Sequence, residues 1–449
     1  MRMTVRKQLT LVEPSVEHEH ARELHEIRRL VGEQPKIADL VHSDLIRGLN
    51  DSQTGRAGMM SAEQVLMVLF IKQMNDFSYT LLAYHLVDSR TYRAVCGFGI
   101  GENVPAASTL QRDIKKIRPQ TLEAINRILL ASAAVKGIEH GRKVRVDCTV
   151  VESNIHHPTD SSLLWDSVRV LSRLTQRAKE ISGIAVTDHR RRAKRRALGI
   201  LNARKNNDRM KLYRDLLKVA RKTVNDAERV RRELKHVPTT APITAIALDA
   251  DLEHYSALAR QVIHQTERRV LAGESLRPED KIVSIFEPHT DIIIKDRREI
   301  FFGHKVTITG GASGLLTDLV IERGNPADVT LAEKMISRQS DIYGRVPRQA
   351  AFDGGFASKD NLKSIKGLGV RDVAFAKKRG LAVSEMAKST WVYKRLRDFR
   401  AGIEGMISFL KRGFGLTRCT WRGLESFQAY AWSSVVTANL LLMARRLLV

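Results

Sequence analysis

The chain has 449 residues, of which 43% are hydrophobic and 28% charged; its formal net charge is +25 and its isoelectric point about 10.2. This length allows roughly two to four domains, and the composition excludes a disordered or fibrous chain. The positive excess favours a polyanionic partner, most simply nucleic acid, because each Lys or Arg placed on a phosphate releases counterions. An anionic membrane surface is the weaker alternative, since no short basic amphipathic helix stands apart as an anchor.

The cysteines and the apolar segments bear on the compartment. Cys96, Cys148 and Cys419 are far apart and form no CxxC pair, which argues against a zinc finger or a disulfide framework. The first residues contain no apolar core long enough for a signal peptide. The apolar run Val435–Leu442 is interrupted by Asn439, so we expect it not to span a bilayer. A cytoplasmic, nucleoid-associated protein with no membrane partner is the resulting expectation.

The N-terminal region, residues 1–135, is predicted to be helical. Residues 1–40 are expected to form a loose arm and one helix. Ser61 and Gln64 form a capping box ahead of an apolar run, which predicts a helix start. Further helices are predicted at Tyr79–Val87, Ser108–Arg118 and Leu122–Ala134. Several short helices suit either a DNA-binding unit, of helix-turn-helix type for example, or a dimerisation and packing domain, and no residue separates the two.

A strand is predicted from Lys143, where apolar and polar residues alternate. Asp147 lies in its middle, where a carboxylate is costly if buried and calls for a counter-ion. A metal ion, a salt bridge to an arginine, and a strand edge that faces water all satisfy this requirement. The pair His156–His157 that follows is more typical of a polar loop than of a metal site, and Thr159 or Asp160 is expected to cap the next helix.

Residues 160–280 have a helical pattern and carry many positive charges. Six of the seven residues of Arg190–Arg196 are basic, including Arg191 and Arg195, and basic residues continue to Lys222. Such a segment indicates a helical hairpin or small bundle with a basic face. We expect this face to contact the DNA backbone, the alternative being a solvated surface without a ligand.

Short apolar runs after residue 282 predict a series of antiparallel strands. These strands are expected at Val283–Phe286, Ile292–Lys295, Phe301–Thr309 and Leu315–Ile321. A loop at 324–328 and a helix at Val329–Gln339 are expected next.

Asp353 follows a predicted strand that ends at Phe352. Gly354 and Gly355 come directly after it, and they are expected to allow a sharp turn and to leave room for a ligand beside the carboxylate. A strand end followed by a glycine-rich turn and a helix, here Lys359–Ile365, is where open α/β sheets place their sites.

A long helix is predicted at Lys394–Arg412, with Arg400, Glu404 and Lys411 along one stripe. Another strand, Val370–Ala376, is predicted before it, and a closing helix at 423–447 after it.

Asp147, Asp353 and Glu404, which we call the acidic triad, are thus expected on three separate elements of an α/β fold. Carboxylates delivered in this way can hold two hard divalent cations. Two such ions activate an attacking oxygen and stabilise a leaving one at a phosphodiester. Arg400 and Lys411 beside Glu404 would hold the DNA strand.

The order of these motifs resembles the DDE transposases of bacterial insertion sequences, members of the RNase H-like superfamily. The spacing Arg400-x3-Glu404-x6-Lys411 is similar to the C-terminal signature of that group, with Arg397 in place of the signature's tyrosine. The stretch VDCTVVESNIHHPTDSSLL looks like the ISNCY subgroup. The fold implied is a mixed-sheet RNase H-like core at 140–449, preceded by the helical N-terminal domain at 1–135. The basic helical block 160–280 is unusual among relatives, and we take it as an insertion into the core.

The resemblance implies that the acidic triad is catalytic and binds metal, with two Mg²⁺ ions, or Mn²⁺ in their place. It implies that Arg400 and Lys411 contact the transposon end; Arg397, which departs from the signature's tyrosine, is expected as a further DNA contact. The partners implied are double-stranded DNA, both terminal repeats and target, and a second copy of the chain when ends are paired. Two alternatives remain at this point: a metal-dependent nuclease of the same fold and a non-catalytic DNA-binding protein.

Overall fold

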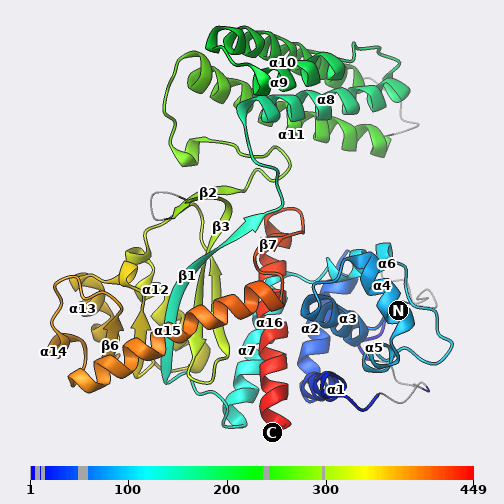
Figure 1. Ribbon diagram of the computed structural model, residues 1–449. Coiled ribbons are helices and arrows are strands. Elements are labelled where there is room, and N and C mark those ends of the chain that lie inside the picture. The colour runs from blue at the N-terminus through cyan, green and yellow to red at the C-terminus, as the bar shows by residue number, and fades with distance from the viewer. Residues whose placement is uncertain (1, 6–10, 12–15, 49–58, 236–241, 296–298) are drawn as a thin grey trace. The chain divides into compact units, whose positions relative to one another are not determined.

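The computed structural model describes residues 2–5, 11, 16–48, 59–235, 242–295 and 299–449. It divides into two compact units, the first made of Met1–Glu152 with His304–Val449 and the second of Ser153–Gly303. The chain leaves the first unit at the end of strand β1 and returns along strand β3 (Figure 1). The architecture is mixed α/β with a helical N-terminal region and a helical basic insertion, which confirms the predicted fold class.

The N-terminal region of the first unit is helical. The predicted capping box is present: Ser61 Oγ accepts from the Gln64 backbone N–H at 3.2 Å, and Gln64 Oε1 accepts from the Ser61 N–H at 3.0 Å. Helix α6 ends at Ile114, earlier than predicted, because Arg118 precedes a proline and is extended. The helices are α1 (Glu19–Gly32), α2 (Pro35–Ile46), α3 (Ala62–Met74), α4 (Tyr79–Asp88), α5 (Arg90–Val95), α6 (Ala107–Ile114) and α7 (Pro119–Val135).

Helix α16 (Leu424–Leu447) packs against α1, α3 and α7 and joins their hydrophobic core. It is buried along most of its length, and the side-chain amide of Asn439 in its middle forms hydrogen bonds through both its oxygen and its nitrogen. Asn439 accepts from the Leu316 N–H and donates to the Leu316 carbonyl, each at 2.8 Å, and it also donates to Asn126. No helix in the described ranges is both long and apolar enough to cross a membrane.

The sheet has seven strands in the order β2-β3-β1-β5-β6, with β4 beside β3 and β7 beside β1. The pairs β2–β3 and β3–β4 are antiparallel, as predicted, and β1–β5–β6 are parallel. The strands are β1 (Lys143–Ser153), β2 (Asp291–Lys295), β3 (Glu299–Gly311), β4 (Leu316–Ile321), β5 (Gln349–Phe352), β6 (Asp372–Phe375) and β7 (Arg418–Cys419).

Four helices accompany the parallel part of the sheet and form a second hydrophobic core with it. Helix α15 lies against β5 and β6, and α13 also contacts β6. Leu396 of α15 and Val146 of β1 both belong to this core. The helices are α12 (Ala332–Tyr343), α13 (Lys359–Gly367), α14 (Val383–Met386) and α15 (Thr390–Gly413).

The second unit is a helical bundle with its own core. Thr159 caps its first helix, as expected, by accepting from the Ser162 N–H. The prediction of a strand at Val283–Phe286 was wrong: Ile285 packs into the bundle core, and Ser284 Oγ accepts from the backbone N–H of Phe286, which turns the chain. The helices are α8 (Asp160–Ser182), α9 (Arg190–Asn202), α10 (Asn206–Leu234) and α11 (Pro242–Thr266).

Candidate active site

The pairing of β1 with β5 brings two members of the acidic triad together. The strands are parallel, and Val146 lies opposite Phe352 at the end of their register. Asp147 follows Val146 and Asp353 follows Phe352, so the two aspartates lie side by side where the paired segment ends. Asp353 follows the carboxyl end of β5, the place where α/β sheets position ligands, and Asp147 lies mid-strand where the parallel pairing of β1 ends.

The face of β1 that carries Asp147 is turned toward helix α15. Arg145, two residues earlier and therefore on the same face, donates from Nη1 to the Phe399 carbonyl at 2.8 Å. Gly402 permits this contact, because a Cβ at that position would lie 2.1 Å from Arg145 Nη1. Helix α15 therefore approaches β1 closely and presents its next turn, with Arg400 and Glu404, to Asp147.

Arg400 contacts all three members of the acidic triad. Its Nη2 lies 2.9 Å from Asp147 Oδ2 and 2.7 Å from Asp353 Oδ1, and its Nη1 lies 2.8 Å from Glu404 Oε1. The Nε atom of Arg400 is buried and has no hydrogen-bond partner among the described residues. Three carboxylates from a mid-strand position, a strand end and a helix thus converge on one guanidinium.

The three carboxylates differ in exposure: the side chain of Asp147 is 14% exposed, that of Asp353 38%, and that of Glu404 68%. Burial raises the pKa of Asp147 from 3.8 to about 6, against the opposing effect of Arg400. The Cys148 backbone N–H, which donates to Asp147 Oδ1 at 2.7 Å, also lowers this pKa. A buried carboxylate beside other carboxylates is typical of a functional position.

Asp353 begins the short 3₁₀ turn Gly354–Phe356 and is its N-cap. The space that a side chain at either glycine would take is filled by the protein itself. A Cβ on Gly354 would lie 2.8 Å from the stem of Lys377, and one on Gly355 would lie 2.4 Å from Asp328 Oδ2. The glycines allow these two side chains of the protein to pack closely on the turn that carries Asp353.

Asp328 and Lys305 are residues of this site that the sequence analysis missed. Lys305, on β3, forms an ion pair with Asp328, and its Nζ donates to the Pro326 carbonyl at 2.6 Å. The Asp328 carboxylate is near enough to Asp147 to raise its pKa further. The signal was present, because Lys305 interrupts an apolar strand just as Asp147 does, and such a charge requires a partner.

The chemistry of the acidic triad suits a divalent metal ion. Carboxylate oxygens are the preferred ligands of Mg²⁺ and Mn²⁺, and all three already share one cationic group. In the described part of the chain, however, no three His, Cys, Asp or Glu side chains form a metal-ligand cluster. The carboxylates are arranged around the arginine.

The other predicted DNA contacts of α15 lie along the same helix. Arg397 is exposed one turn before Arg400, and Lys411 is partly buried in the last turn of α15. Cations lie over the aromatic ring of Phe399, and the Nζ atom of Lys143 is 4.1 Å from the centre of that ring.

In the second unit, Arg191 and Arg195 are exposed on helix α9, and Lys194 lies on the same face. These three, which we call the α9 basic stripe, have no acidic partner in the described ranges. Their neighbours differ, since Arg192 and Arg196 both pair with Asp215 and Arg190 pairs with Asp188. A second series of exposed cations at helical spacing, the α10 basic stripe, consists of Lys211, Arg214, Lys218 and Lys222.

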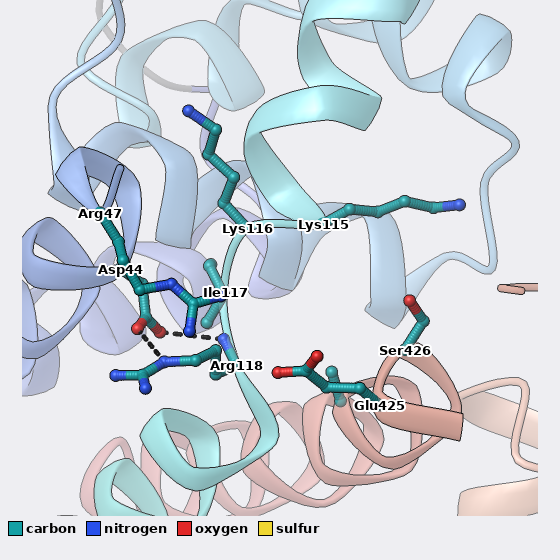
Figure 2. Close-up of a pocket in the computed structure, with 9 residues that line it drawn as sticks. Asp44, Arg47, Lys115, Lys116, Ile117, Arg118, Glu425 and Ser426 are labelled. Atoms are coloured by element: carbon teal, nitrogen blue, oxygen red, sulfur yellow. Dashed lines mark hydrogen bonds and ion pairs between the residues drawn. The ribbon is translucent and has the colours of Figure 1, made fainter. Parts of the chain in front are cut away.

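A separate polar pocket of about 190 Å³ lies between α2, the α6–α7 connection and the start of α16 (Figure 2). Asp44 is buried there and accepts from the backbone N–H of Arg118 at 2.9 Å and from its side chain. Figure 2 shows Lys115 and Lys116 extending in different directions, so the cations around this pocket do not converge on one point. The contact of Asp44 with Arg118 joins α2 to the start of α7, and the lining of the pocket includes no member of the acidic triad.

Comparison with known protein families gave two matches. The family described as "Transposase DDE domain" matches residues 293–440, and the family described as "Transposase domain (DUF772)" matches residues 12–116. No curated protein and no solved structure matched the chain.

The first match contains the acids Asp353 and Glu404 and the strands and helices around them, so the site belongs to a DDE domain of RNase H-like fold. This pair of domains is typical of bacterial insertion-sequence transposases. Asp147 and the second unit up to residue 292 lie outside both matches, and their roles rest on the geometry alone.

Proposed function

We propose that the protein cuts DNA at the ends of an insertion sequence and transfers the freed 3′-hydroxyl strand to target DNA, with the acidic triad as its metal ligands. The observation that supports this most directly is the convergence of Asp147, Asp353 and Glu404 on the guanidinium of Arg400. Carboxylates that meet from three separate elements at the edge of a parallel sheet are positioned for chemistry, since packing alone requires no such cluster.

In this proposal Asp147, Asp353 and Glu404 hold divalent cations, two Mg²⁺ ions by preference. Bound there, such ions activate the attacking oxygen and stabilise the leaving oxygen of a phosphodiester. The fold positions these ligands. The pairing of β1 with β5 holds Asp147 and Asp353 beside each other. Glu404 is exposed to solvent, on the side from which DNA would bind.

Backbone contact with DNA is assigned to cations on α15 and on the second unit. Arg397 and Lys411 flank the acidic triad along α15, and the α9 and α10 basic stripes offer further positive charge on the second unit. Cations spaced by three or four residues can follow the phosphates of a duplex without reading its sequence. A homodimer that pairs two ends is part of the proposal.

The test is a reaction of the protein with Mg²⁺ and a DNA fragment that carries the element's end. Nicks at a defined position, followed by products joined to a second duplex, support the transposase. Nicks without joined products would indicate a nuclease of the same fold. Tight binding with no cleavage in Mg²⁺ or Mn²⁺ would refute both enzymes and leave a DNA-binding protein.

A further inference from the structure

Arg400 contacts every carboxylate that the proposed function assigns to divalent metal ions. We propose, building on that function, that Arg400 and a divalent cation compete for the acidic triad, and that Arg400 moves to a DNA phosphate when the metal binds. Arg400 is then an exchangeable counter-ion of the site.

The local charge balance supports an exchange. Asp147, Asp353, Glu404 and Asp328 contribute four negative charges, and Arg400 and Lys305 contribute two positive ones. The site thus keeps an excess of two negative charges. A divalent ion added beside the guanidinium would meet it at a few ångströms, where like charges repel strongly in a partly buried site. Movement of Arg400 removes this repulsion and frees the oxygens it occupies.

The hydrogen bonds of Arg400 are incomplete in its present position. Nη2 is shared by two carboxylates and Nη1 is used by a third, but the buried Nε donates to no described group. A buried donor without a partner lowers the stability of the arrangement that contains it. A phosphate could accept from Nε and one Nη together, which is the bidentate geometry that arginine forms with phosphate groups.

The two cations of the site differ in how firmly they are held. Lys305 is fixed by two groups of one loop, the Asp328 carboxylate and the Pro326 carbonyl, so it remains with Asp328. Arg400 lies on the flank of α15, and its partner Glu404, one turn later, is 68% exposed. An exposed ion pair of this kind contributes little free energy, so Glu404 does little to hold Arg400. The largely buried contact of Arg400 with Asp147 is the one that a metal ion must replace.

The exchange predicts coupling between ligands. If DNA draws Arg400 away from the acidic triad, DNA must increase the affinity for metal, and metal must increase the affinity for DNA by the same factor. Without Arg400 this part of the coupling disappears.

The experiment measures Mn²⁺ binding to the full chain by titration calorimetry or by the electron paramagnetic resonance of free Mn²⁺. Wild type is compared with Arg400→Gln and Arg400→Ala, and with Arg395→Gln as the matched control. Arg395 is an exposed cation on the same helix with no assigned DNA contact, so its loss changes the net charge equally. Asp147→Asn identifies binding at the acidic triad, and circular dichroism shows that each variant is folded.

Without DNA we expect Arg400→Gln to bind Mn²⁺ at least roughly tenfold more tightly than wild type, because a competing charge at a few ångströms has been removed. Arg395→Gln should stay close to wild type. A short DNA duplex should tighten Mn²⁺ binding by wild type and leave that of Arg400→Gln almost unchanged.

Equal Mn²⁺ affinity of wild type and both Arg400 variants, with Asp147→Asn much weaker, would overturn the exchange and leave the metal role of the triad intact. If neither wild type nor the Arg400 variants bound Mn²⁺, with or without DNA, the metal role would fail and the exchange with it.

Discussion

Val146 and Phe352 lie opposite each other in the parallel pair β1–β5, and this single register places Asp147 beside Asp353 although 205 positions of the chain separate them. A shift of one residue would turn Asp147 to the opposite face of the sheet, away from α15. The site therefore depends on the apolar packing of these two strands as much as on its charged residues.

The first prediction concerns the acidic triad. Asp147→Asn, Asp353→Asn and Glu404→Gln should each reduce Mg²⁺-dependent cleavage by more than about a hundredfold, since loss of a residue that only supports a metal ligand already costs up to that factor. An amide is a weaker ligand and carries no charge. Duplex binding, measured by fluorescence anisotropy, should survive in all three. Near-normal cleavage by one of them would remove that residue from the active site.

The raised pKa of Asp147 makes a prediction about stability. The folded protein holds this proton up to about pH 6, whereas the unfolded chain releases it near 3.8. The ionised carboxylate therefore lowers stability as the pH rises through this window, and the loss is complete above it. Asp147→Asn should be more stable than wild type by about 1–3 kcal/mol at pH 7.5, and equally stable below pH 3.8. Urea unfolding at both pH values tests this; a destabilised variant at pH 7.5 would contradict it.

Metal binding should depend on the same titration of Asp147, but it should become stronger as the pH rises, because only the ionised carboxylate is a good ligand. Mn²⁺ affinity should decrease below about pH 6, where Asp147 takes up its proton. Calorimetric titrations between pH 5 and pH 8 in metal-free buffers measure the trend. Affinity that is constant across this range would show that Asp147 is not a ligand.

The α9 basic stripe permits a comparison within one helix. Arg191→Ala and Arg195→Ala should each weaken duplex binding and reduce the slope of log K against log salt by about one. Arg192→Ala should have a smaller effect, because Arg192 is already paired with Asp215. Lys411→Ala, on α15, should also reduce the slope. Identical slopes for Arg191→Ala, Arg192→Ala and wild type would exclude this face from the DNA interface.

Both glycines after Asp353 should be sensitive to an added methyl group. Gly355→Ala would bring its Cβ against the Asp328 carboxylate, which is held by Lys305, and we expect a loss of stability of about 1–3 kcal/mol. Gly354→Ala would bring its Cβ to 2.9 Å from the Cβ of Lys377, which is fixed to the backbone and cannot rotate away, so this variant should lose at least as much stability.

Thermal unfolding and cleavage rates compare the two variants. Adding Asp328→Gly to Gly355→Ala removes the clash and should recover part of the stability, as a double-mutant cycle would show. If Gly354→Ala proved harmless, the packing described for this turn would be wrong.

Much of this architecture was predictable because its signals are local. The alternation around Asp147 identified β1, and the stripe of Arg400 and Glu404 identified the polar face of α15. The apolar run at Val283–Phe286 led to a wrong prediction of a strand, because this segment is a loop that packs onto helices of the second unit. Apolarity alone does not distinguish a buried loop from a strand.

The arrangement around Arg400 could not be predicted from the sequence. That one guanidinium contacts three acids depends on the register of β1 with β5 and on the close approach of α15 at Gly402. Lys305 and Asp328 form a pair across 23 positions, and only the folded sheet and its loop bring them together. Such contacts arise from tertiary packing, whereas periodicity reports only the elements.

The insertion of α16 among α1, α3 and α7 has a consequence for synthesis on the ribosome. Helices α1 to α7 emerge first, yet the apolar surface that α16 covers must wait until residues 424–447 have been translated. At roughly 5–20 residues per second this delay is on the order of half a minute. During that time the nascent chain would expose part of its largest core, which makes it a natural client for chaperones.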